Sequence, residues 1–89
     1  MASQKIAKNF IVSRAGGLQL PFAAEFAETA ARFVAVVTVI NQGRVADGKS
    51  IMPLLMLGAQ RGAVVTVTIE GPDAQAALQA IEALCPSEC

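Results

Sequence analysis

Residues 16–26 read GGLQLPFAAEF, in which two glycines lead into an alanine-rich segment. Gly16 and Gly17 predict a turn, because glycine takes the positive φ of tight turns at little cost; a backbone nest for an anion is the alternative. A helix is expected next, since Pro21 is tolerated in a first turn and apolar residues then recur at helical spacing. The recurring positions are Phe22, Phe26, Ala30 and Phe33. The stretch therefore predicts a turn that opens an amphipathic helix.

Strand-like segments lie on both sides of this helix. Alternation predicts a first strand over residues 6–12, with one face formed by Ile6, Lys8, Phe10 and Val12. Residues 34–40 are rich in β-branched side chains, and the NQG turn at 41–43 predicts a tight reversal into a short strand over 44–47. Alternating valine, threonine and isoleucine predict a further strand over 64–69.

Two more helices complete the predicted order. Ser50 is expected to cap a short helix that reads IMPLLMLGA, with Pro53 in its first turn and Gly58 at its end. Asp73 is expected to cap the last helix, whose apolar stripe comprises Ala74, Ala77, Leu78, Ile81 and Leu84. The order β-α-β-β-α-β-α predicts one α+β domain over residues 1–89, with helices on one face of a mainly antiparallel sheet.

The composition narrows the classes of function. Seven basic and seven acidic residues in 89 give no net charge, and 54% of the residues are hydrophobic. Without a net positive charge, the chain has no electrostatic feature that favours binding to nucleic acid or an anionic membrane. No apolar run of about 18 residues and no signal-peptide pattern occurs, so a cytoplasmic protein is expected. No metal or cofactor is expected, because the chain has no histidine and Cys85 and Cys89 lie in a short tail; thiol chemistry there is an open alternative.

Several short motifs share one family resemblance. They are GLxxxxAAxF at 17–26, GKS at 48–50, LG at 57–58 and GxVVTxxxEG at 62–71. Together, and at these spacings over nearly the whole chain, they resemble HPr, the phosphocarrier of the bacterial phosphoenolpyruvate-dependent sugar phosphotransferase system. The resemblance implies an open-faced β-sandwich with a four-stranded sheet in the order 1-4-2-3 and three helices on one side.

The resemblance also places the family's phosphorylation site in the opening stretch. Family members read GLHxRPAA there, and the histidine receives phosphate from enzyme I while the arginine helps to hold it. This chain reads GLQLPFAA, which places Gln19 on the histidine and Pro21 on the arginine. A neutral imidazole offers a free lone pair, whereas a carboxamide nitrogen is delocalised and a poor nucleophile. With no histidine in the chain, phosphocarrier chemistry is predicted to be absent, and the protein is not expected to be an enzyme.

Ser50 matches the serine that an ATP-dependent kinase phosphorylates in many HPr proteins. A phosphate there would place negative charge at the start of a helix and beside Lys49. The alternative is that Ser50 is only a structural cap. Crh-like regulatory members of the family resemble this chain in having glutamine at the place of Gln19 and the serine at Ser50; they differ at Pro21, where they keep arginine.

The helix predicted after Ser50 is too apolar to be buried completely. At 100° per residue, Leu54 and Leu57 point to the sheet while Met52 and Met56 point away. A surplus of exposed apolar side chains is typical of a partner surface. Its expected members are Leu18, Gln19, Leu20, Phe22, Lys49, Ile51, Met52, Leu55 and Met56. The resemblance implies proteins as partners, such as a serine kinase/phosphorylase or a transcription regulator. A homodimer, a patch without function and a docking module without phosphorylation stay open.

Overall fold

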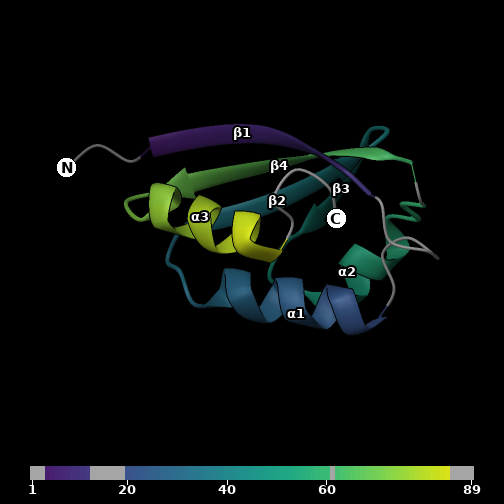
Figure 1. Ribbon diagram of the computed structural model, residues 1–89, viewed down its shortest axis with the longest axis horizontal. Coiled ribbons are helices and arrows are strands. Elements are labelled where there is room, and N and C mark those ends of the chain that lie inside the picture. The colour runs from purple at the N-terminus through teal and green to yellow at the C-terminus, as the bar shows by residue number, and fades with distance from the viewer. Residues whose placement is uncertain (1–3, 13–19, 61, 85–89) are drawn as a thin grey trace.

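The order of elements predicted from the sequence is confirmed by the structure, a computed structural model that describes residues 4–12, 20–60 and 62–84. The elements are β1 (Gln4–Ile11), α1 (Leu20–Ala31), β2 (Val36–Asn41), β3 (Arg44–Asp47), α2 (Ile51–Met56), β4 (Val64–Gly71) and α3 (Ala74–Leu84). The sheet has the order β1-β4-β2-β3, and every neighbouring pair is antiparallel. The three helices cover one face of the sheet (Figure 1), which gives the expected two layers.

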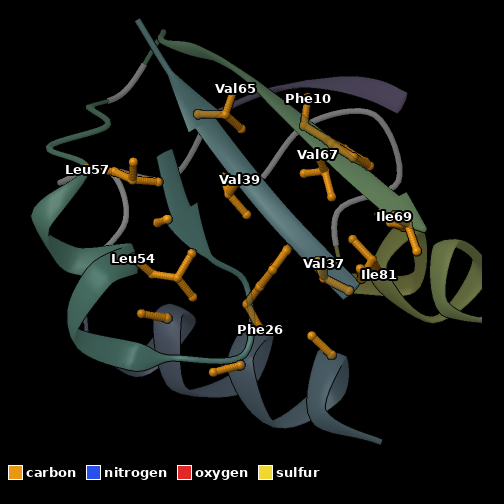
Figure 2. Packing of buried hydrophobic residues seen from close by; sticks show 14 of the residues in the cluster. Phe10, Phe26, Val37, Val39, Leu54, Leu57, Val65, Val67, Ile69 and Ile81 are labelled. Atoms are coloured by element: carbon orange, nitrogen blue, oxygen red, sulfur yellow. The ribbon is translucent and has the colours of Figure 1, made fainter. Parts of the chain in front are cut away.

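The core lies between the sheet and the helices. In the sheet, Phe10 pairs with Val65, and Val67 pairs with Val39, so that alternate residues of three strands face the helices. Figure 2 shows these side chains pointing toward those of the helices, among them Phe26. The largest fully buried side chains are Phe10, Val12, Val37, Val39, Val67, Ile69 and Ile81. The helical stripe expected at the end of the chain is confirmed, with Ala74, Ala77 and Ile81 buried.

The hairpin between β2 and β3 follows the predicted reversal. Gln42 and Gly43 have φ values of 50° and 82°. Two central residues with positive φ are typical of a type I′ turn, whose twist matches that of the flanking strands. The tight turn sets Asn41 opposite Arg44 and thereby fixes the register of β3.

The carboxylate of Asp73 has a different role from the predicted helix cap. Asp73 does precede α3, but its Oδ2 accepts the N–H of Val34 at 2.8 Å and its Oδ1 accepts that of Ala35 at 2.9 Å. The strand was predicted to begin at Val34. The N–H groups of Val34 and Ala35 bind Asp73 instead of a neighbouring strand, and β2 begins at Val36. Asp73 therefore ties the segment before β2 to the start of α3.

The same contacts make Asp73 sensitive to acid. The hydrogen bond from Val34 holds the pKa of Asp73 below its ordinary value of 3.8 against the opposing effect of burial, and Ala35 and the Lys49 ammonium lower it further. Because the folded pKa is depressed, the ionised carboxylate stabilises the fold above the unfolded pKa. This contribution is lost as the pH falls below 3.8 and through the lower folded pKa.

Asp73→Asn is expected to destabilise the protein at neutral pH, by an amount that shrinks as the pH falls below 3.8. Denaturant titrations of both proteins from about pH 7 to about pH 2 measure the difference. Glu28→Gln, at an exposed position of α1, is the charge-matched control. Its free energy of unfolding is expected to stay within about 0.5 kcal/mol of that of the wild type at neutral pH. A difference for Asp73→Asn that is constant with pH would contradict the assigned role.

The end of β4 lies so close to the segment before β2 that Gly71 has no room for a side chain. A Cβ at Gly71 would lie 2.5 Å from the Cα of Ala35 and 2.8 Å from its Cβ. Because the obstacle is backbone, the strands would have to move apart. Gly71→Ala is expected to cost about 1–3 kcal/mol of unfolding free energy. Chemical denaturation measures this cost, with exposed Glu70→Ala as the neighbouring control; equal stability of the two variants would contradict the packing.

Candidate functional site

Ser50 lies directly before α2 in extended conformation, with φ −122° and ψ 127°. It therefore has the predicted N-cap position, but its side chain makes no capping hydrogen bond. The hydroxyl instead donates to Oδ2 of Asp47 at 3.4 Å, and the backbone N–H donates to the Asp47 carbonyl at 3.1 Å. The predicted capping bond is wrong because a carboxylate three residues earlier accepts the same hydroxyl.

Asp47 and Lys49 shape the surroundings of Ser50. Oδ1 of Asp47 accepts the Lys49 N–H at 2.9 Å, an Asx-type turn that orders the segment between β3 and α2. The Lys49 ammonium donates to the carbonyl of Phe33 at 2.7 Å. The ammonium thus binds the backbone that follows α1, while the Ser50 hydroxyl is hydrogen-bonded to the carboxylate of Asp47. The sequence analysis missed Asp47, although an aspartate two residues before Lys49 across Gly48 is a turn signal.

The exposed side of α2 is apolar, as the helical spacing predicted. Met52 is 64% exposed and Met56 70%, whereas Leu54 and Leu57 are buried in the core. Ile51 is exposed at the flank. Leu55, another expected member of the partner surface, is partly buried and packs against the core. Methionine is a flexible side chain that adapts to varied partners, so this side of α2 is suited to contact another protein.

One predicted member of this surface is placed wrongly. Phe22 is 3% exposed, and its ring centroid lies 6.2 Å from that of Phe26. The two rings are one helical turn apart on the stripe that faces the core, so the helical spacing itself contained the signal for burial. Phe22 therefore supports α1 from inside and is not part of the exposed face.

The other predicted residues of the first helix are placed only in part. Leu18 and Gln19 lie outside the described residues. Leu20 and Pro21 begin α1, and their side chains are not described. The described part of the chain contains no group of three or more acidic, cysteine or histidine residues that could hold a metal ion. In that same part, no helix has both the length and the apolar character needed to cross a membrane.

Comparison with known proteins decides the family. The model of the family described as PTS HPr component phosphorylation site matches residues 6–87. The chain belongs to the HPr family. The phosphocarrier protein HPr of Vibrio cholerae is similar to it, with 38% identity over 77 residues that make up 86% of this chain and 91% of that protein.

Solved structures of HPr-family proteins share the fold. The phosphocarrier protein HPr of Bacillus anthracis superposes with a TM-score of 0.83 at 37% identity, covering 91% of this chain and 96% of that one. The Bacillus subtilis catabolite-repression protein Crh has a TM-score of 0.71 at 37% identity, covering 82% and 84%. That protein is described as an intertwined, domain-swapped dimer. The HPr sheet order and three-helix layer expected from the resemblance are therefore confirmed.

Proposed function

We propose that this HPr-family protein is a cytoplasmic regulatory or protein-binding module that carries no phosphoryl group on histidine. The observation that carries the proposal is that the 89-residue sequence contains no histidine. The family motif supports it, because GLQLPFAA sets Gln19 at the phosphoacceptor place and Pro21 at the arginine place. An amide is a poor nucleophile at neutral pH, and proline cannot clamp a phosphate as a guanidinium does.

The binding role is supported by the exposed side of α2. Met52 and Met56 present apolar surface next to the start of α2, where Ser50 and Lys49 lie. A partner that covered this side would meet apolar and polar groups together, an arrangement typical of the centre and rim of an interface. The partners proposed here are a serine kinase/phosphorylase and a transcription regulator, the classes that the family resemblance implies.

Regulation is proposed to act through Ser50. Ser50 is partly exposed, and within the described residues the hydrogen bond of its hydroxyl is the 3.4 Å bond to Asp47. A phosphate on this oxygen would replace a neutral hydroxyl by about −1.5 to −2 charges next to the exposed side of α2. The charge would change which partners that side accepts while leaving buried Leu54 and Leu57 untouched.

Incubation with an HPr serine kinase and ATP is expected to add one phosphoryl group, and mass spectrometry of a protein digest is expected to place it at Ser50. Ser50→Ala is the matched control, because it removes the hydroxyl and no capping bond. Met52→Lys/Met56→Lys is expected to raise the KM of the kinase with a smaller change in kcat, since the face is proposed to contribute binding. A protein that stays unmodified while HPr is modified in the same reaction would contradict regulation at Ser50.

A docking module without phosphorylation is the second candidate. The specific observation in its favour is the Asp47 carboxylate, which lies 3.4 Å from the Ser50 hydroxyl and would repel a phosphate there. Asp47→Asn separates the two candidates. If repulsion alone prevents modification, the variant is modified by the kinase and the wild type is not; if both are modified, the second candidate is wrong.

A further inference from the structure

A groove with a volume of about 440 Å³ lies between β3 and α2. It is lined by Arg44, Val45, Pro53, Met56 and Leu57. Figure 1 shows β3 and α2 at the same end of the molecule, and the two elements are in contact. The groove adjoins the exposed side of α2 through Met56 but lies on the side toward the sheet edge. Apart from Arg44, its lining side chains are apolar.

The wall formed by β3 is the edge of the sheet. Among residues 4–12, 20–60 and 62–84, β3 pairs with β2 alone, so these residues provide no strand partner for its other side. The two-residue turn makes the pair of Asn41 and Arg44 a hydrogen-bonded one, and the next pair, Ile40 with Val45, is then non-hydrogen-bonded. The backbone N–H and C=O of Val45 therefore point outward, where an added strand can bind them.

The charge of the groove is positive. The exposed Arg44 forms no ion pair with any residue in the described part of the chain, and α2 contains no charged residue. The guanidinium lies over the end of α2, where Nη1 would be 3.9 Å from a Cβ at Gly58. The Asp47 carboxylate, on the same strand, accepts bonds from Lys49 and Ser50. A carboxylate of a bound segment could therefore pair with a guanidinium that no described residue engages in an ion pair.

We propose that the groove between β3 and α2 binds an extended segment of a partner protein that adds a strand to β3. The segment places a carboxylate against Arg44 and, two positions away on the same face, an apolar side chain against Pro53 and Met56. The period of two residues in a strand sets this spacing. The proposal rests on the proposed function in that it assumes α2 faces a protein partner, and it adds the conformation and charge of that partner.

The test uses the full isotope-labelled chain and the synthetic peptide Thr-Val-Thr-Glu-Thr-Val-Thr, which places valine and glutamate on one face of a strand. Saturable amide shifts are expected within residues 44–47 and 54–58. A peptide with lysine in place of glutamate is expected to bind roughly three- to tenfold more weakly, the scale of one exposed ion pair and its reversal. A peptide with proline at positions 3 and 5 is expected to lose binding, because it lacks two backbone N–H donors.

Charge reversal in the protein completes the test. Arg44→Glu is expected to reverse the preference, so that the lysine peptide binds more tightly than the glutamate peptide. Arg32→Glu is the control, because Arg32 is an exposed arginine directly after α1 and does not line the groove. Three results would overturn the proposal: no saturable shift, equal binding of both peptides, or concentration-dependent shifts of 44–47 without peptide, which indicate a second copy. None of them bears on Ser50, whose modification is measured separately.

Discussion

Phe10→Ala is expected to lower the free energy of unfolding by about 3–5 kcal/mol, the cost of removing a buried aromatic ring. Phe10 is 1% exposed and comes from β1, which is an edge strand of the described sheet and pairs there with β4. Its ring lies among side chains of α1, α2 and the sheet, where a void of about 20 Å³ already exists. Because these neighbours belong to different elements, they cannot close together over the missing ring without moving the layers.

This loss is large for a domain of this size. A chain of 89 residues typically has about 4–13 kcal/mol of stability in total. Urea denaturation followed by circular dichroism measures the change, and a fall in midpoint without a change in slope shows that stability alone has changed. Phe10→Leu is expected to cost about half as much or less, since it keeps most of the apolar volume.

Ile11→Ala is the matched control on the same strand. Ile11 lies on the opposite side of β1 and is 46% exposed, so its truncation is expected to cost less than about 1 kcal/mol. Similar losses for Phe10→Ala and Ile11→Ala would contradict the assignment of the two faces of β1.

Much of this architecture was predictable because it depends on local repeats. Alternation placed Phe10 and Val12 on one face of a strand, where both are buried, and helical spacing separated buried Leu54 from exposed Met52. The NQG turn was predictable for the same reason, since positive φ at adjacent positions is a local requirement. These features follow from the neighbours of each residue in the chain.

The contacts that were not predicted depend on choices between competing partners. The Asp73 carboxylate could cap its own helix, but it binds the N–H of Val34, which lies 39 residues away in sequence. The Ser50 hydroxyl could cap α2, but it donates a hydrogen bond to the carboxylate of Asp47. The Lys49 ammonium binds the carbonyl of Phe33, a contact that exists only once α1 has packed beside α2. The periodicity of the sequence does not show which of these competing partners a side chain binds.

The groove between β3 and α2 was likewise not visible in the sequence. Arg44 and Pro53 come from separate elements, and only the packing of α2 beside the sheet edge brings them together. The composition of α2 predicted an exposed apolar side. It did not predict that the edge strand β3 lies beside this helix. The predicted partner surface and the groove share Met56, so a single protein can contact both.

The second large effect concerns phosphorylation of the chain by enzyme I, and it is all or none. The fold of a phosphocarrier family is kept, and the proposed function assigns Gln19 and Pro21 to the places of the motif's histidine and arginine. Gln19→His/Pro21→Arg is therefore expected to gain a phosphoryl acceptor that the wild type lacks, because it restores both a ring nitrogen and a bidentate clamp. Gln19→Asn/Pro21→Arg is the control, since it restores the clamp without a nucleophile.

The most direct measurement is the incubation of the wild-type chain with enzyme I and phosphoenolpyruvate, followed by detection of acid-labile phosphate on the chain. The HPr of Vibrio cholerae serves as the positive control in the same reaction. We expect HPr to become phosphorylated while this chain carries no acid-labile phosphate at any time point. Acid-labile phosphate on the wild-type chain would contradict the claim that it has lost the family's relay chemistry.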